Sequence, residues 1–202
     1  TGVGAGTCNI IFTITGGCGG TVSAQQSITV DPNSSITSVT GASPLCIGAT
    51  TTYTANGVVL SGGTGAWSSS DVLVATVNPA TGLVTAVGAG TCNIIFTITG
   101  GCNGPVSAQQ SFTVNPNSSI TSVTGTSPLC IGATATYTAN GIVLSGGTGA
   151  WSSSDILVAT VNPTTGLVTA VSAGTCNIIF TITGGCNGPV SAQQSLTVNP
   201  NS

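Results

Sequence analysis

The chain is built from copies of one unit. Residues 36–118 return as residues 120–202 with seven differences over 83 aligned positions, and residues 1–35 are a partial third copy. The offset of 84 residues is too long for a solenoid turn or a propeller blade, so each copy is expected to be a whole small domain. We therefore expect a partial repeat at 1–35 that supplies only the last two strands of a domain, followed by complete repeats at 36–119 and 120–202.

Charged side chains are almost absent, which excludes most kinds of chemistry. There is no Lys, Arg or His, and the only acidic residues are Asp31, Asp71 and Asp155. Without basic groups the chain cannot neutralise phosphates, so no nucleic-acid partner is expected. Isolated Asp residues cannot divide the acid and base roles of catalysis, and Cys without His does not form a protease-like dyad. The composition predicts no enzyme, no catalytic residue, no bound metal and no cofactor.

The low charge also bears on the protein's setting. Only 1 % of residues are charged, against about a quarter in ordinary globular proteins. A net charge of −3 is too small to keep molecules apart by repulsion, which favours self-association. No apolar run reaches the roughly 18 residues of a membrane helix, so no membrane insertion is expected. The lack of an initial Met and of a signal peptide leads us to expect a mature fragment or a segment of a longer chain.

The apolar residues predict a small antiparallel β-sandwich without helices. Segments rich in Val, Ile, Thr and aromatic residues alternate with clusters of Gly, Pro, Asn and Ser. Residues 78–82 (Asn-Pro-Ala-Thr-Gly) predict a tight hairpin, and residues 100–104 predict the loop between the last two strands. In the first complete repeat the expected strands are 36–40, 50–55, 65–68, 74–78, 83–87, 92–99 and 109–114.

Alternation along the strand at 92–99 selects the residues expected in the core. Cys92, Ile94, Phe96 and Ile98 share one face of this strand, and that face is expected to point inward. A Trp from the strand at 65–68 would pack across the sandwich. The predicted core therefore includes Trp67, Trp151, Phe96 and Phe180.

Four motifs in fixed order resemble the bacterial immunoglobulin-like group 2 domain. They are Trp-Ser-Ser-Ser-Asp at 67–71, Val-Ala-Thr-Val at 74–77, Gly-Leu-Val-Thr-Ala at 82–86, and Ala-Gly-Thr at 89–91. The resemblance implies an all-β fold of tandem immunoglobulin-like antiparallel β-sandwich domains, about 84 residues per repeat. It also implies an extracellular or cell-surface location in stalks, adhesins or fibres, with no shared active site.

The cysteines depart from that family. The string Leu-Cys-Ile-Gly at 45–48, together with Gly-Cys at 101–102, looks like the cysteine-bearing immunoglobulin-like repeats of large bacterial surface proteins. No two cysteines are close enough in sequence for a zinc knuckle and no His assists, so disulfides are favoured over metal sites. The disulfide candidates are Cys8, Cys18, Cys46, Cys92, Cys102, Cys130, Cys176 and Cys186.

Three cysteines per complete repeat leave at least one thiol of each unit free or bonded outside its domain. Cys92 and Cys102 lie at opposite ends of one strand, about 25 Å apart at about 3.3 Å per residue, so they are not expected to form a disulfide. In an immunoglobulin topology two schemes remain. Cys46 closes on Cys92, leaving Cys102 for an outside partner, or Cys46 reaches Cys186 of the next repeat, leaving Cys92 as a buried thiol. The resemblance favours the second.

Other marked residues have ordinary structural explanations. Asp71 and Asp155 follow three serines and are expected to cap turns through backbone hydrogen bonds, since calcium needs six or more oxygen ligands. Asn33 and Asn117 begin Asn-Ser-Ser sequons, which makes them candidate glycosylation sites and glycans candidate partners.

Function is therefore expected to be structural. The leading hypothesis is an extracellular fibre formed by end-to-end and lateral self-association of the repeats. An adhesin stalk is the alternative, and a carbohydrate-binding module, which needs exposed aromatic residues, is the third.

The partial repeat adds an expectation of its own. A two-stranded hairpin with Ile10, Phe12 and Ile14 on one face would leave that face bare. We expect it to pack against another chain or copy.

Overall fold

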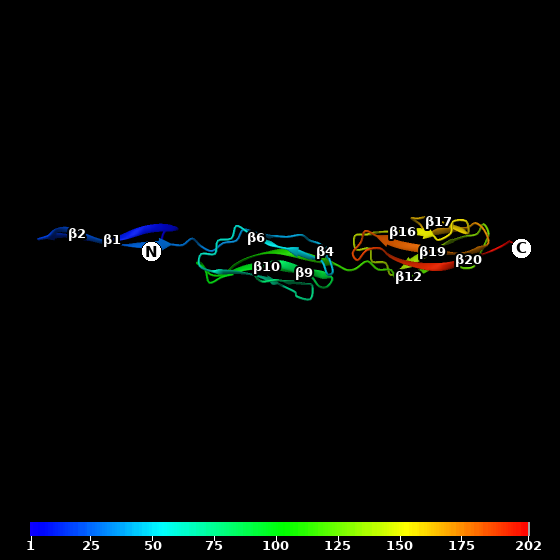
Figure 1. Ribbon diagram of the computed structural model, residues 1–202, viewed down its shortest axis with the longest axis horizontal. Helices are drawn as coiled ribbons and strands as arrows, with labels where there is room; N and C mark the ends of the chain where they lie inside the picture. Colours follow the sequence, from blue (N-terminus) through cyan, green and yellow to red (C-terminus); the bar gives the residue numbers. More distant parts are fainter. Residues whose placement is uncertain (202) are drawn as a thin grey trace. The chain divides into compact units, whose positions relative to one another are not determined.

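The computed structural model describes residues 1–201, which form an all-β chain (Figure 1). The expected fold class is thereby confirmed. The chain divides into two compact units: Thr1–Ser43 with Thr50–Thr85 and Thr91–Phe112, and Pro44–Ala49 with Ala86–Gly90 and Thr113–Ser202. Within the described residues, no helix is long and apolar enough to cross a membrane.

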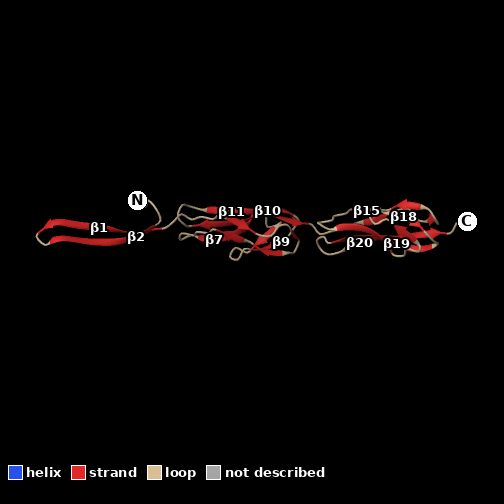
Figure 2. Ribbon diagram, turned by 90° about the horizontal axis from the view of Figure 1, so that it is seen from above, coloured by secondary structure: helices blue, strands red, loops and turns tan. Residues whose placement is uncertain are grey.

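The second complete repeat is a sandwich of short sheets (Figure 2). Its main sheet has the order β13-β20-β19-β16, opposed by β14-β18-β17 and the pair β12-β15. The strands are β12 (Ser122–Thr124), β13 (Leu129–Cys130), β14 (Thr134–Thr136), β15 (Thr138–Asn140), β16 (Thr148–Ser153), β17 (Ala159–Val161), β18 (Leu167–Ala170), β19 (Gly174–Thr183) and β20 (Val190–Asn199).

The first complete repeat has the same strand order in its sheets. They are β4-β11-β10-β7, β5-β9-β8 and β3-β6. The strands are β3 (Ser38–Thr40), β4 (Leu45–Cys46), β5 (Thr50–Thr52), β6 (Thr54–Asn56), β7 (Thr64–Ser69), β8 (Ala75–Val77), β9 (Leu83–Ala86), β10 (Gly90–Thr99) and β11 (Val106–Asn115). All seven expected strands are present, but the one expected at 50–55 divides at Tyr53 into β5 and β6, which belong to different sheets.

Strand β4 was not expected. Its two residues pair in parallel with the end of β11, Leu45 opposite Val114 and Cys46 opposite Asn115. A two-residue strand has no alternation to read, and a parallel partner nearly seventy residues away leaves no local signal. This strand is what positions Cys46.

The core follows the predicted alternation along β10 and β19. Ile94 and Ile98 are fully buried, and so are Ile178 and Ile182. Trp67 on β7 lies opposite Phe96 on β10, with ring centroids 5.0 Å apart, and Trp151 packs on Phe180 at the same distance. Both Trp side chains and Phe180 are buried, whereas Phe96 is half-buried.

The hairpin expected at 78–82 is present in both repeats. The side-chain oxygen of Asn78 accepts hydrogen bonds from the amides of Ala80 and Thr81, both 3.0 Å long. Gly82 has φ of +73°, and a Cβ there would lie 2.7 Å from the carbonyl oxygen of Tyr53. Glycine is therefore required by both backbone conformation and space.

The partial repeat forms a two-stranded antiparallel sheet. β1 (Gly6–Gly17) pairs with β2 (Gly20–Val30), with Phe12 opposite Ala24 and Cys8 opposite Ile28. Every residue of both strands is exposed except Val30, which is half-buried. The two strands expected from this segment are present without a covering sheet.

Candidate functional site

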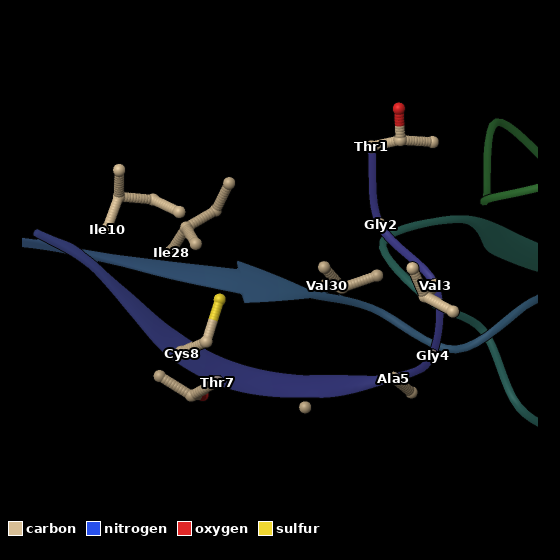
Figure 3. A pocket seen from close by; sticks show the side chains of 11 residues that line it. Thr1, Gly2, Val3, Gly4, Ala5, Thr7, Cys8, Ile10, Ile28 and Val30 are labelled. Carbon is tan, nitrogen blue, oxygen red and sulfur yellow. The ribbon is translucent and has the colours of Figure 1, made fainter.

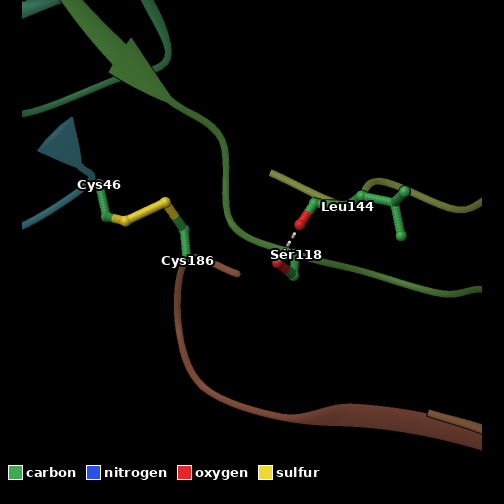
Figure 4. Close-up of a disulfide and its surroundings, with 4 residues drawn as sticks. All are labelled: Cys46, Ser118, Leu144 and Cys186. Atoms are coloured by element: carbon green, nitrogen blue, oxygen red, sulfur yellow. Dashed lines mark hydrogen bonds between the residues drawn. A yellow bond between two sulfur atoms is a disulfide. The ribbon is translucent and has the colours of Figure 1, made fainter. Parts of the chain in front are cut away.

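A disulfide joins the two complete repeats. The sulfur atoms of Cys46 and Cys186 are 2.00 Å apart and their Cα atoms 5.4 Å apart, and the residues are separated by 140 positions in the sequence (Figure 4). Cys46 ends β4, and Cys186 lies in the loop between β19 and β20. Both residues fall in the second compact unit, which contains Pro44–Ala49.

The backbone around Cys46 is held by three kinds of contact. β4 pairs with β11, the amide of Ala49 donates to the carbonyl of Cys46 at 3.0 Å, and the amide of Gly48 donates to Ala86 at 2.9 Å. The turn after Cys46 passes through Gly48, whose φ is +86°. The Leu-Cys-Ile-Gly string thus forms a short strand and a tight turn that present the cysteine at a fixed place.

The loop that carries Cys186 is held by the segment joining the repeats. The amide of Ser118 donates to the carbonyl of Cys186 at 2.9 Å, and the hydroxyl of Ser118 donates to the carbonyl of Leu144 at 2.9 Å (Figure 4). Ser118 is buried, so these bonds satisfy polar groups that would otherwise be costly. Asn187 follows the cysteine with φ of +76°.

Cys102 lies in a loop with the same hydrogen bonds as the loop of Cys186, but it has no disulfide partner among the described residues. The amide of Ser34 donates to its carbonyl at 3.0 Å, and the hydroxyl of Ser34 donates to Leu60 at 2.9 Å. Asn103 has φ of +77°. The loops at Cys102 and Cys186 therefore have matching contacts, and only one holds a disulfide.

The pairing is the second of the two schemes drawn from the sequence. Strand β11 lies between β4 and β10, so Cys46 is two strands away from Cys92, roughly 9.6 Å at about 4.8 Å per strand. That separation exceeds the span of a disulfide. Cys92 instead points into the core and is within 3.7 Å of the hydroxyl of Ser69. The remaining thiols are buried at Cys176 and exposed at Cys8, Cys18 and Cys130.

The sequence profile of the family described as bacterial Ig-like domain (group 2) matches residues 24–101 and 108–187. These ranges cover well over half of the chain. The chain belongs to the bacterial Ig-like domain (group 2) family. No curated protein is detectably similar to it in sequence.

Three solved structures align with these group 2 Ig-like domains at low identity. Mouse cadherin-23 EC22-24 aligns with a TM-score of 0.50 and 13% identity, over 96% of this chain and 74% of that one. The surface layer protein SbsC, domains 1–6, gives 0.37 and 14%, over 98% and 36%. A C-terminal fragment of intimin, solved with the intimin-binding domain of its translocated receptor, gives 0.44 and 16%, over 82% and 64%.

The aromatic residues of the group 2 domains lie inside, except for the half-buried Phe96. Tyr53 lies edge-on to Trp67 and to Phe112, with ring centroids 6.4 and 6.0 Å apart. Burial raises the pKa of Tyr53 above its usual 10.0, and the neighbouring Cys92 raises it further; Tyr137 is shifted in the same way by burial and by Cys176. Trp67 and Trp151 are each 7 % exposed, so neither offers an open ring on which a sugar could stack.

The polar residues marked in the sequence lie at turns of the group 2 domains. The carboxylate of Asp71 accepts from the amide of Leu73 at 2.9 Å, and Asp155 does the same with Leu157. Within residues 1–201 no group of three or more His, Cys, Asp or Glu side chains could hold a metal ion. Asn33 and Asn117 are exposed beside the buried Ser34 and Ser118.

Proposed function

We propose that the chain is the repeating part of an extracellular structural protein, in which successive Ig-like domains are tied by disulfides and associate end to end and side by side into a filament. The observation that carries this proposal is the Cys46–Cys186 disulfide, which connects one repeat with the next. Both cysteine positions of this disulfide recur in the repeats, since Cys130 matches Cys46 and Cys102 matches Cys186. The cross-link can therefore be repeated at every junction of a longer array.

The chemistry of the disulfide also supports the location. Disulfides form and persist in oxidising compartments such as the cell exterior, and are rare where thiols are kept reduced. Family membership agrees with this setting, because such domains occur on bacterial surface proteins. A junction disulfide typically contributes about 2–4 kcal/mol to stability.

Exposed apolar residues support the lateral part of the proposal. Val72 and Leu73 are 61 % and 77 % exposed, and their counterparts Ile156 and Leu157 are 67 % and 73 % exposed. With a net charge of −3 there is little repulsion between chains. Each complete repeat therefore presents an apolar pair at the same position for contact with a neighbouring molecule.

Electron microscopy of the purified, oxidised chain tests the proposal. Long uniform filaments are expected, whereas isolated thin rods would favour the adhesin stalk, in which the repeats only hold a separate binding domain away from the cell. A double variant, Cys46→Ser with Cys186→Ser, serves as the control and should give shorter or less regular filaments. Dispersed monomers at high protein concentration would contradict the filament.

A further inference from the structure

The complete repeats carry Asn-Gly pairs at two positions. In an Asn-Gly pair the backbone nitrogen of the glycine can attack the side-chain carbonyl carbon of the asparagine, because glycine has no side chain to hinder the approach. The cyclic imide that forms then hydrolyses to aspartate or isoaspartate, so each pair is able to gain a carboxylate. The four pairs are Asn56-Gly57, Asn103-Gly104, Asn140-Gly141 and Asn187-Gly188.

The pair at the end of β6 is held in place. The Nδ2 atom of Asn56 donates to the hydroxyls of Ser38 and Thr40 at 3.3 and 3.1 Å. The backbone carbonyl of Asn56 accepts from the amide of Thr37 at 2.9 Å, and a Cβ at Gly57 would overlap the hydroxyl of Thr37. The asparagine side chain must therefore give up both hydrogen bonds before it can turn toward the glycine nitrogen.

The second complete repeat holds the matching pair at the end of β15 in the same way. The Nδ2 atom of Asn140 donates to the hydroxyls of Ser122 and Thr124 at 3.3 and 3.1 Å. A Cβ at Gly141 would overlap the hydroxyl of Thr121. Both repeats therefore restrain the asparagine amide at this position.

The pairs in the loops after β10 and β19 lack these restraints. Asn103 and Asn187 are exposed, and within residues 1–201 neither their side chains nor the amides of Gly104 and Gly188 form a hydrogen bond. A Cβ at either glycine would meet no atom within 4 Å. The side-chain amide and the nitrogen that would attack it are therefore both accessible, with open space around them.

Most other asparagines lack an accessible neighbouring amide. Four precede proline, whose nitrogen carries no hydrogen: Asn78, Asn115, Asn162 and Asn199. Three precede a branched isoleucine inside a strand: Asn9, Asn93 and Asn177. Asn33 and Asn117 precede Ser34 and Ser118, whose amides already donate to the carbonyls of Cys102 and Cys186 at 3.0 and 2.9 Å.

The partial repeat has no Asn-Gly pair at the matching position. Its loop at 16–20 reads Gly-Gly-Cys-Gly-Gly, so Gly19 stands where the complete repeats have Asn103 and Asn187. The hollow of about 410 Å³ beside the β1–β2 hairpin is lined by small or apolar residues and contains no asparagine (Figure 3). The reactive pairs therefore belong to the complete repeats.

We propose that Asn103 and Asn187 are sites of spontaneous deamidation. The hydrogen bonds of Asn56 and Asn140 protect the other two pairs. In the first step the nitrogen of Gly188 bonds to Cγ of Asn187, the bond from Cγ to Nδ2 breaks, and Nδ2 leaves as ammonia with the proton from the glycine amide. Water then adds to one of the two imide carbonyls and reopens the ring, which restores the glycine N–H or transfers the peptide bond to the side chain. One water is consumed and one ammonia is released, with no oxidant or reductant.

The modification changes the charge of the loops that carry the cysteines. The chain has no Lys or Arg to neutralise a new carboxylate, and two deamidations take the net charge from −3 to −5. In one loop the new charge adjoins Cys186, which forms the junction disulfide. The reaction needs only the folded chain and water, so it is independent of filament formation.

Peptide mapping of the oxidised full chain after incubation at mildly alkaline pH tests the proposal. Pepsin is used because trypsin has no Lys or Arg at which to cleave. The repeats differ at positions 58 and 142 and at 112 and 196, so the mass of each peptide identifies its asparagine. Asn103 and Asn187 should convert at least tenfold faster than Asn56 and Asn140. Equal conversion of all four in the folded protein would overturn the proposal.

Two controls separate the effect of the fold from that of the local sequence. In the reduced, denatured chain all four pairs should convert at similar rates, and a selectivity that persists there would contradict protection by the fold. In the variant Ser122→Ala with Thr124→Ala, Asn140 loses both side-chain hydrogen bonds and should convert faster, while Asn56 in the same molecule stays slow. No acceleration at Asn140 would overturn the role given to these hydrogen bonds.

Discussion

Tyr53 and Tyr137 occupy the same position in the two complete repeats, but their hydroxyl groups have different surroundings. The hydroxyl of Tyr137 donates to the carbonyl of Thr126 at 2.9 Å, whereas the buried hydroxyl of Tyr53 has no hydrogen-bond partner among residues 1–201. A satisfied hydrogen bond contributes about 1 kcal/mol, and an unsatisfied buried hydroxyl carries a desolvation cost. The two repeats therefore provide an internal comparison of one side chain.

Replacing each Tyr with Phe should give different results. Tyr137→Phe is expected to lower the free energy of unfolding by about 1 kcal/mol, while Tyr53→Phe should leave it unchanged or raise it. Urea denaturation of the two single variants measures the difference. A larger loss from Tyr53→Phe than from Tyr137→Phe would contradict the hydrogen-bond assignment.

The same residues predict loss of stability in alkali. Their pKa values are raised in the folded state, mainly by burial, so folding disfavours the phenolate. Because the folded pKa lies above the unfolded value, this contribution is fully present below about pH 10 and is lost as the pH rises through the raised folded value. In the double variant Tyr53→Phe with Tyr137→Phe, the free energy of unfolding should fall less steeply above pH 10 than in the unmodified protein. Identical pH profiles for the two proteins would rule out the phenols as its cause.

At the scale of single strands, the packing of side chains on paired strands decides which positions tolerate substitution. Trp67 on β7 faces Phe96 on β10 and contacts Tyr53, so it joins the two layers of the first complete repeat. Gly65 lies near the same ring, and a Cβ at that position would overlap Phe96. Large and small residues therefore alternate along β7 to fit one aromatic partner.

Truncating the tryptophan should destabilise the domain severely. Trp67→Ala is expected to lower the free energy of unfolding by about 3–5 kcal/mol because it leaves a large cavity. Thermal and urea unfolding measure the loss, and Val72→Ala, at an exposed position, is the control that should change stability by less than about 0.5 kcal/mol. If Trp67→Ala leaves unfolding unchanged but removes binding to a sugar, the carbohydrate-binding hypothesis replaces the structural one.

For the whole molecule, the cysteines divide into three roles. Cys46 and Cys186 join repeats, Cys92 and Cys176 are buried in the sandwiches, and the exposed thiols and Cys102 are free within residues 1–201. Reactivity follows exposure, since a buried thiol in apolar surroundings is inert. The role of each cysteine is therefore set by its place in the repeat.

Native alkylation followed by mapping tests this division. Cys8, Cys18 and Cys130 should react in the folded protein, while Cys92 and Cys176 should react only after unfolding. Cys46→Ser should lower stability by about 2–4 kcal/mol, with Cys130→Ser, its unbonded counterpart, as the neutral control. Rapid native labelling of Cys92 would contradict its place in the core.

Lateral association is a separate property of the whole molecule. Leu73→Ser with Leu157→Ser removes the larger part of the exposed apolar pairs and should reduce side-by-side bundling in electron micrographs. The junction disulfide should be unaffected, because Leu73 and Leu157 lie in the loops before β8 and β17, whereas Cys46 ends β4 and Cys186 lies in the loop after β19. Bundles of unchanged width would show that other surfaces mediate lateral contact.

The sequence by itself determined the features that depend on short-range periodicity or on direct repetition of the chain. The 84-residue offset predicted the repeated units, alternation at Cys92, Ile94 and Ile98 predicted the buried face, and the Asn78–Gly82 string predicted its turn. In each of these the physical cause lies within a few neighbouring residues or in direct repetition of the chain.

Only the tertiary structure decided the features that depend on distant segments. The parallel pairing of Leu45 with Val114 separates Cys46 from Cys92 by a whole strand and directs it to Cys186, where sequence left two schemes open. The division of one strand at Tyr53 and the half-burial of Phe96 likewise depend on which sheet covers each residue. The bare face of the β1–β2 hairpin has the same cause, because nearly identical strands are buried or exposed according to whether other strands lie over them.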